Sequence, residues 1–269
     1  MPEGPEVRRV FHDLMSEMKG KSIVEMNILG GRFAKKEPVG FSEMKYPVPV
    51  TNGGVRGKFI WFRLGESSSM WITLGMSGTW STDRSKHAHF EIKMSDGGSL
   101  YFVDPRRFGT LRFSHDPSEL DKKLSSMGMD LLNDPEEIIR PYDFITKLNK
   151  HSKRTIAEVL MNQSVCAGVG NYIKCEALYA SKVSPFRLVS NMRKLEMLRI
   201  YEAIKRIMHA SYDQGGATIR DYKRVNGEAG NFAFSFKVYG QKKDPFGNDV
   251  VREETLDGRT THWVPSEQS

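Results

Sequence analysis

The chain has 269 residues, enough for one large domain or two ordinary ones, and 39% of them are hydrophobic, which predicts a soluble globular protein. No apolar run approaches the roughly 20 residues of a membrane span, and the acidic start does not resemble a secretory signal. The formal net charge of +7 permits a polyanionic partner, while the presence of only two cysteines excludes a disulfide framework and favours a reducing, intracellular compartment.

The amino terminus reads MPEGPEV and continues into a helical pattern. Apolar residues from Val7 to Met18 follow i, i+3, i+4 and i+7 spacing, which predicts one amphipathic helix that ends near Gly20. Pro and Glu suit a first helical turn. Removal of Met1 would also leave Pro2 with a free secondary amine, which is a nucleophile. The opening stretch alone fits both interpretations.

Residues 22–114 carry β signals. Five short runs, KFIWFRL, SMWITLGM, HAHFEIKM, SLYFVD and GTLRF, are separated by Gly, Ser and Asp turns, which is typical of a sandwich or barrel. After Pro117 the residue pattern predicts helices, and Asp134 followed by Pro135 predicts a helix start. The sequence therefore predicts an α+β protein with an N-terminal β-sandwich and a helical C-terminal part.

The chain loses its helical period past Gly215, where a Gly-rich polar stretch predicts a long loop, and it ends in a predicted hairpin with turns at FGND and LDGR. We expect four segments: a β-sandwich domain at 1–116, a linker at 117–134, a helical domain with the long loop at 135–231, and a hairpin at 232–269.

Four stretches carry the chemistry: MPEGPEV at the start, VRGKFIW at 55–61, DPRRFG at 104–109, and QSVCAGVGNYIKCEALYASKVSP at 163–185. In this order, with TLGMSG and VYGQ between and after them, they resemble the formamidopyrimidine-DNA glycosylase and endonuclease VIII (Fpg/Nei) family of bifunctional DNA glycosylases. The resemblance runs nearly end to end. It implies a helix–two-turn–helix domain followed by a finger hairpin.

The resemblance implies that Pro2 attacks the sugar C1′ of a damaged nucleotide, displaces the base and forms an iminium intermediate, whose elimination then cuts the strand. Glu3 would act as the general acid on the ribose ring oxygen. Glu6, one helical turn later, either supports the site or is a solvated carboxylate. Lys58 is either an exposed strand-end lysine or, as the resemblance implies, a phosphate contact counted with the catalytic residues.

A base that is turned out of duplex DNA leaves a hole in the stack, and the resemblance assigns Met76, Arg106 and Phe108 to filling it. The alternative for Met76 and Phe108 is a place in the core. Asn171 follows a tight turn at a helix start and is implied to contact phosphate. Three nearby basic residues fit the same phosphate-binding surface, although each of them taken alone is interpreted as a solvated surface charge: Lys153, Arg154 and Lys174.

Typical bacterial members of this family end in a zinc finger held by four cysteines, whereas residues 232–269 here contain no cysteine and one histidine. The tail therefore resembles the zincless-finger branch, and we expect no zinc and no other cofactor. Arg259 matches the finger-tip arginine that grips phosphates. Packing in place of metal is expected from Phe246, Val250, Val251 and Trp263.

The resemblance implies a bifunctional DNA glycosylase and AP lyase of base excision repair that cuts by β,δ-elimination. We expect it to act as a monomer on double-stranded damaged DNA, inside the cell and away from membranes. The MPEGP opening resembles endonuclease VIII-like proteins, and this resemblance implies a preference for oxidised pyrimidines and hydantoins. Two alternatives stay open: a glycosylase that prefers 8-oxoguanine and formamidopyrimidine, and an inactive DNA-binding relative.

Overall fold

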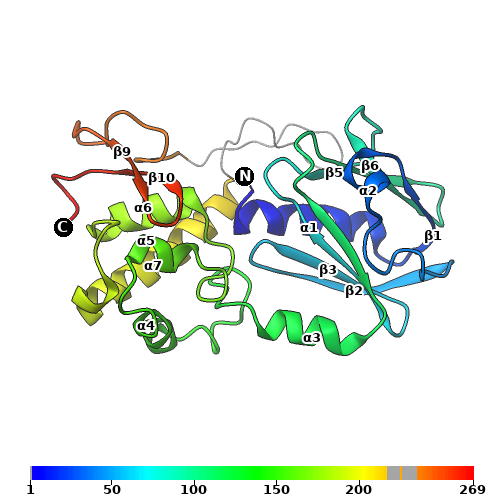
Figure 1. Cartoon of the computed structure of the whole chain (residues 1–269), viewed down its shortest axis with the longest axis horizontal. Helices are drawn as coiled ribbons and strands as arrows, with labels where there is room; N and C mark the ends of the chain where they lie inside the picture. The colour runs from blue at the N-terminus through cyan, green and yellow to red at the C-terminus, as the bar shows by residue number, and fades with distance from the viewer. Residues whose placement is uncertain (1, 217–224, 226–234) are drawn as a thin grey trace. The chain divides into compact units, whose positions relative to one another are not determined.

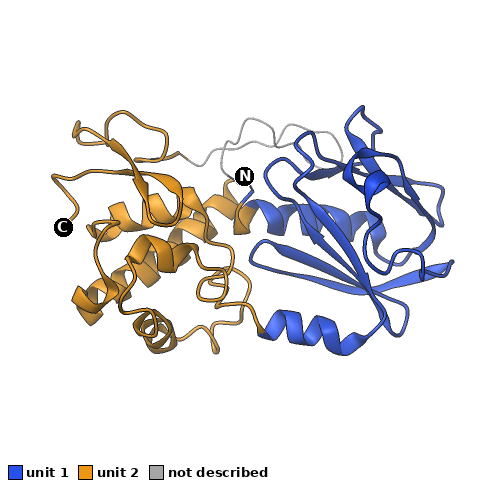
Figure 2. Ribbon diagram, viewed as in Figure 1, with its two compact units in different colours: residues 1–2, 6–125, 215–232 blue, residues 3–5, 126–214, 233–269 orange. Residues whose placement is uncertain are grey.

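The computed structural model describes residues 2–216, 225 and 235–269, and it divides the chain into two compact units. Unit 1 comprises residues 1–2, 6–125 and 215–232, and unit 2 comprises residues 3–5, 126–214 and 233–269 (Figure 2). Most of the predicted long loop past Gly215 lies outside the described residues.

Unit 1 is an antiparallel sheet with helices, as the alternating runs predict (Figure 1). The sheet has eight strands in the order β5-β7-β6-β1-β2-β3-β4-β8, and its two halves meet through only two paired positions between β1 and β2. This gives the sandwich-like arrangement expected from the sequence. The strands are β1 Ser22–Ile28, β2 Val48–Arg56, β3 Phe59–Leu64, β4 Ser68–Thr73, β5 Thr79–Ser81, β6 Ala88–Met94, β7 Ser99–Val103 and β8 Thr110–Ser114, and the helices are α1 Gly4–Met18, α2 Gly31–Lys35 and α3 Pro117–Ser125.

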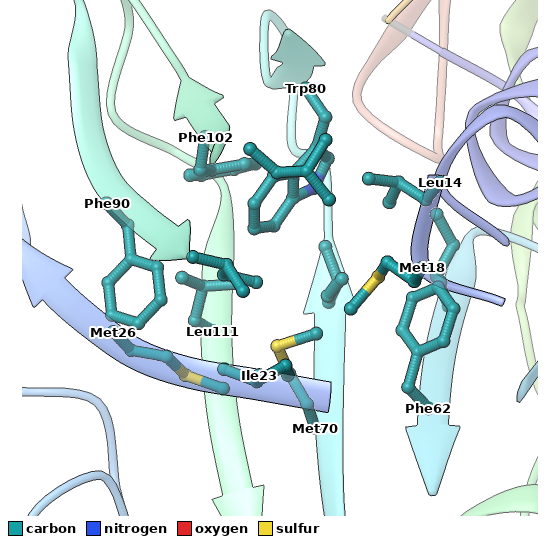
Figure 3. Packing of buried hydrophobic residues seen from close by; sticks show 14 of the residues in the cluster. Leu14, Met18, Ile23, Met26, Phe62, Met70, Trp80, Phe90, Phe102 and Leu111 are labelled. Carbon is teal, nitrogen blue, oxygen red and sulfur yellow. The ribbon is translucent and has the colours of Figure 1, made fainter. Parts of the chain in front are cut away.

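The core of unit 1 lies between α1 and the sheet. Leu14 and Met18 on the apolar face of α1 point toward side chains of the strands, including Phe62 (Figure 3). Two glycines of β2 allow close packing, because a Cβ on Gly53 would lie 2.8 Å from the Phe62 ring and one on Gly54 would lie 2.6 Å from the Trp61 ring. Strand β2, which lies inside the sheet between β1 and β3, is thereby packed closely against side chains of β3.

Unit 2 is helical and ends in a two-stranded hairpin, so the predicted α+β class is confirmed. Its helix α6 is buried along nearly all its length and packs against α7 and β10 (Figure 1). A helix that is buried all round must satisfy every charge it carries. The elements are α4 Pro141–Asn149, α5 Ile156–Met161, α6 Asn171–Ser181, the 3₁₀ turn η1 Val189–Asn191, α7 Lys194–Asp213, β9 Val251–Thr255 and β10 Arg259–Trp263.

The helix predicted to start at Asp134 begins instead at Pro141. Residues 134–140 form bends and turns, and the Asp134 carboxylate accepts a hydrogen bond from the Asp130 amide at 3.0 Å. The reason is local: Arg140 precedes a proline, which disfavours helical backbone there, and its ψ is 137°. Pro141 then takes the first helical position.

The packing predicted for the hairpin was half right. Val250 packs partly buried against a cluster of Cys175, Tyr179, Val238 and Val264, and Trp263 stacks edge-on against Phe186. The prediction was wrong for Phe246 and Val251, because their side chains are 80% and 38% exposed. Phe246 lies in a turn whose amides bind the buried Asp244 carboxylate, and this leaves its ring in solvent.

Candidate active site

The Glu3 carboxylate lies on the amino terminus of α6. One carboxylate oxygen accepts a hydrogen bond from the Tyr172 amide at 2.9 Å, and the other accepts one from the Ile173 amide at 3.2 Å. These amides belong to the first turn of the helix, where backbone donors have no partner inside the helix and the macrodipole is positive. Glu3 is buried, so this charge is held rigidly beside the second residue of the chain.

The GVGN turn is shaped around this carboxylate. A Cβ added to Gly170 would lie 2.2 Å from the Glu3 carboxyl carbon, so only glycine leaves room for it. The Gly168 carbonyl accepts the Gly4 amide at 2.9 Å and fixes the neighbouring residue of the amino-terminal segment. Residues 3–5 of the MPEGPEV stretch and the GVGNY stretch are therefore one structural feature of unit 2.

Gln163, which sequence reasoning missed, holds this turn together. Its side-chain amide donates to the Val169 carbonyl at 2.9 Å and to the Met161 carbonyl at 3.0 Å, and its oxygen accepts the Gly168 amide at 3.0 Å. One side chain thus ties the end of α5 to the turn before α6. The only available signal was a polar residue next to an apolar turn, which many surface loops share.

The other predicted catalytic residues belong to unit 1. Pro2 is buried where the chain enters α1, and Glu6 is fully buried in the first turn, which excludes a solvated carboxylate there. Lys58 is half-buried in the two-residue turn between β2 and β3. Gly57, with φ of 56°, supplies the left-handed backbone that this tight turn requires.

The predicted void-filling residues lie on two loops that touch each other. A Cβ on Gly75, next to Met76, would approach the Phe108 carbonyl carbon to 2.7 Å. Met76 is half-buried, whereas Phe108 is 54% exposed, so a core position is excluded for Phe108. The exposed Arg106 guanidinium lies 5.2 Å from the centre of the Phe108 ring. An exposed aromatic ring and an exposed guanidinium therefore lie side by side on this loop.

Asp104 and Ser77, which the sequence did not single out, brace these loops. The buried Asp104 carboxylate accepts the Ser77 hydroxyl at 2.6 Å and the Gly109 amide at 2.7 Å. The Ser77 oxygen in turn accepts the Arg106 amide at 3.1 Å. This network crosses from one loop to the other and fixes both ends of the DPRRFG stretch.

Asn171 joins the start of α6 to the terminal hairpin. Its side-chain nitrogen donates to the Thr260 carbonyl at 2.8 Å, and its buried side-chain oxygen has no hydrogen-bond partner among the described residues. Arg259 is exposed at the first position of β10, one residue before Thr260. These two residues, 88 positions apart in the numbering, are therefore brought to one region of unit 2.

Lys174 is not the surface charge predicted from the sequence. It is fully buried, and its ammonium lies 2.6 Å from the Asp257 carboxylate, which is also buried. Lys153 and Arg154, by contrast, are exposed as expected. The partner of Lys174 is 83 positions away, so no local pattern could reveal the pair.

The thiols are poor nucleophiles in this environment. Burial raises the pKa of Cys175 to about 12, although the His262 amide donates a hydrogen bond to its sulfur at 3.3 Å. Burial likewise raises the pKa of Cys166 to about 12. Both thiols are therefore protonated at neutral pH, and neither supplies the thiolate that nucleophilic catalysis requires.

Three domain families match consecutive parts of the chain: the formamidopyrimidine-DNA glycosylase N-terminal domain over residues 1–111, its H2TH domain over 131–223 and its C-terminal domain over 228–269. A formamidopyrimidine-DNA glycosylase from Wolbachia pipientis is 30% identical, with 98% of each chain covered. The chain belongs to the formamidopyrimidine-DNA glycosylase family. It is therefore a DNA glycosylase of base excision repair with AP lyase activity.

Solved structures of Fpg proteins share the whole fold. A Lactococcus lactis Fpg variant in complex with Fapy-dG-containing DNA matches with a TM-score of 0.87 and 26% identity, and all of both chains is covered. The wild-type Lactococcus lactis Fpg in complex with DNA containing an oxidised pyrimidine matches with a TM-score of 0.85 and 25% identity, again over all of both chains. These DNA complexes show the kind of partner that the family binds.

Two features of the described residues bear on membranes and metals. In the parts of this glycosylase that the structure describes, no helix is long and apolar enough to span a bilayer. The same residues contain no cluster of three or more His, Cys, Asp or Glu side chains arranged to hold a metal ion.

Proposed function

We propose that the nucleophile of this Fpg-family glycosylase is the amine of Pro2, freed by removal of Met1. The observation that carries the proposal is the fixed position of Glu3 on α6, because Pro2 is joined directly to it. An α-amine has an ordinary pKa near 8, so a useful fraction is neutral at pH 7. The amine would bond to C1′ of the damaged nucleotide, and the electrons of the glycosidic bond would leave with the base.

Glu3 is proposed to move the proton that this reaction releases. Formation of an iminium removes the proton from the Pro2 nitrogen and breaks the bond between C1′ and the ring oxygen, which must gain a proton. The two amide hydrogen bonds fix the Glu3 carboxylate beside Pro2, and this position is what would allow Glu3 to accept that proton and then to donate it to the ring oxygen. Glu6, buried in the same helical turn of the chain, is proposed to support the site.

The iminium then acidifies the neighbouring sugar carbon, and elimination breaks the strand on the 3′ side and then on the 5′ side. This β,δ-elimination requires that the sugar stay covalently attached through both steps. A buried, clamped amino-terminal segment supports such retention, because the segment does not fray.

Lys58, Asn171 and Arg259 are proposed to bind phosphates around the flipped nucleotide. Asn171 is held at the start of α6 by its hydrogen bond to the Thr260 carbonyl, beside the exposed Arg259. The exposed Arg259 offers a bidentate donor. Met76, Arg106 and Phe108 are proposed to fill the void in the stack, which the exposure of Phe108 and its contact with Arg106 support.

We place the chain in the endonuclease VIII-like, zincless-finger branch and propose oxidised pyrimidines and hydantoins as preferred lesions. The MPEGP opening supports this branch, and the tail without cysteine lacks the ligands that structural zinc needs. The set of Met76, Arg106 and Phe108 favours the second candidate, a glycosylase that prefers 8-oxoguanine and formamidopyrimidine. The names of the relatives agree with that candidate.

A lesion panel with borohydride present tests the proposal. Duplexes carrying thymine glycol, a hydantoin, 8-oxoguanine or an abasic site should all be compared, with undamaged duplex as the control. We expect covalent trapping on the first two and on the abasic site, with faster turnover than on 8-oxoguanine, and no stoichiometric zinc in the enzyme. Faster excision of 8-oxoguanine would assign the second candidate, and binding without any trapping would identify an inactive relative.

A further inference from the structure

Lys174 lies in α6, the most buried helix of unit 2, and its positive charge is paired with the carboxylate of Asp257 in the hairpin turn. Its ammonium contacts the Asp257 carboxylate at 2.6 Å and the Thr255 hydroxyl at 3.4 Å. The side chains of Lys174 and Asp257 are 0% and 4% exposed. A buried ion pair of this kind contributes little net stability, but the loss of one partner is costly, so its main effect is to fix geometry.

Asp257 belongs to the turn that joins β9 to β10 and leads directly into Arg259. The Thr255 hydroxyl bonds to the Asp257 carboxylate and lies 3.1 Å from the Arg259 carbonyl oxygen and 2.7 Å from the Thr261 hydroxyl. Thr255 and Thr261 are buried, whereas Arg259 between them is exposed. The polar network therefore holds the turn that leads into the exposed Arg259.

Lys174 is the middle of three contacts along one face of α6. Asn171 donates to the Thr260 carbonyl at 2.8 Å, and the Cys175 sulfur accepts the His262 amide at 3.3 Å. These α6 positions are spaced i, i+3 and i+4, so they share a face. Each bonds to a different part of the hairpin, and only the Lys174 contact reaches the turn itself.

We infer that Lys174 is a positioning residue for Arg259: its buried ion pair with Asp257 holds the hairpin turn so that the arginine meets a DNA phosphate. This inference rests on the proposed phosphate contact of Arg259. A hairpin of two five-residue strands is marginally stable by itself, so the turn needs an anchor. The residues 232–269 offer no cysteine to hold it through a metal, and the ion pair supplies the anchor from α6.

The test is the salt dependence of binding to a duplex that carries a tetrahydrofuran analogue of an abasic site. Loss of one phosphate contact lowers the slope of log K against log salt by about 0.9. We expect this decrease for Arg259→Ala, for Lys174→Met and for Asp257→Asn, each in full-length protein shown to be folded by circular dichroism. The double variant Lys174→Met with Arg259→Ala should bind no more weakly than Arg259→Ala alone.

Lys205→Met is the matched control, because it removes a lysine of the same unit from an exposed ion pair with Glu136. Its slope should stay at the parent value. If Arg259→Ala lowers the slope and folded Asp257→Asn and Lys174→Met do not, Lys174 has only a structural role and the inference is wrong. If Arg259→Ala itself leaves the slope unchanged, the proposed phosphate contact fails, and the inference fails with it.

Discussion

The Glu3 carboxylate accepts the backbone amide of Tyr172 at 2.9 Å across 169 positions of sequence. This bond joins the first residues of the chain to α6, which lies within the residues that match the H2TH domain. The positive end of that helix stabilises the negative charge of Glu3. The amino terminus of this glycosylase is thus part of the packed structure.

Gly170→Ala tests whether the position of the Glu3 carboxylate on the amino terminus of α6 is required for activity. The added methyl group would overlap the Glu3 carboxyl group, so Glu3 must leave the helix terminus. We expect a loss of about 1–3 kcal/mol in the free energy of unfolding. We also expect a fall in single-turnover excision that is larger than the fall in DNA affinity. Gly98→Ala is the control, because its Cβ would meet only the tip of the Asp96 side chain. Normal excision by folded Gly170→Ala would remove Glu3 from the mechanism.

Asp104→Asn tests the brace beneath the void-filling loops. Asparagine keeps the shape but replaces one acceptor oxygen by a donor, so either Ser77 or the Gly109 amide loses its partner. A buried group that loses its hydrogen-bond partner costs about 1–3 kcal/mol, so we expect excision from duplex DNA to slow roughly tenfold. Excision from single strands, where no void forms, should change little. Equal losses on both substrates would contradict the role of these loops, and Asp96→Asn in an exposed turn is the matched control.

Asp244 makes the terminal hairpin region sensitive to acid. The pKa of Asp244 is lowered to about 2, because hydrogen bonds from Asn248, Tyr179 and Phe246 outweigh the opposing effect of burial. An unfolded aspartate titrates near 3.9, so the stabilisation is complete above about pH 4 and is lost as the pH falls toward 2. The difference in Tm between the parent and Asp244→Asn should therefore shrink over that range. A constant difference would contradict this assignment, and exposed Asp249→Asn is the control.

Five strands of the eight-stranded sheet and the first helix could be predicted because apolar periodicity is a local property, whereas β1, β2 and β5 had no predicted run. The run HAHFEIKM gave β6 almost to the residue, and the pattern from Val7 gave α1. The start of α4 was misplaced because an Asp-Pro signal competed with the Arg140–Pro141 step. Local patterns cannot predict contacts between residues that are far apart in the sequence. Lys174 looks like a surface charge until Asp257 lies beside it.

The site was predicted through resemblance, and the structure adds what resemblance does not specify. It buries Glu6, exposes Phe108 and gives Gln163 and Asp104 their roles as braces. Neither residue has a sequence signal, because the groups that Gln163 and Asp104 bond to lie close together only after folding. Phe246 illustrates the opposite error: an aromatic residue in a hairpin looks like packing, yet its turn directs it into solvent.

Peptide mapping of the borohydride-trapped complex tests the central claim most directly. After nuclease and protease digestion, mass spectrometry should place the sugar remnant on a peptide whose first residue is Pro2, with Met1 absent. A remnant on a lysine peptide, such as one that contains Lys58, or on a protein that retains Met1, would contradict the account.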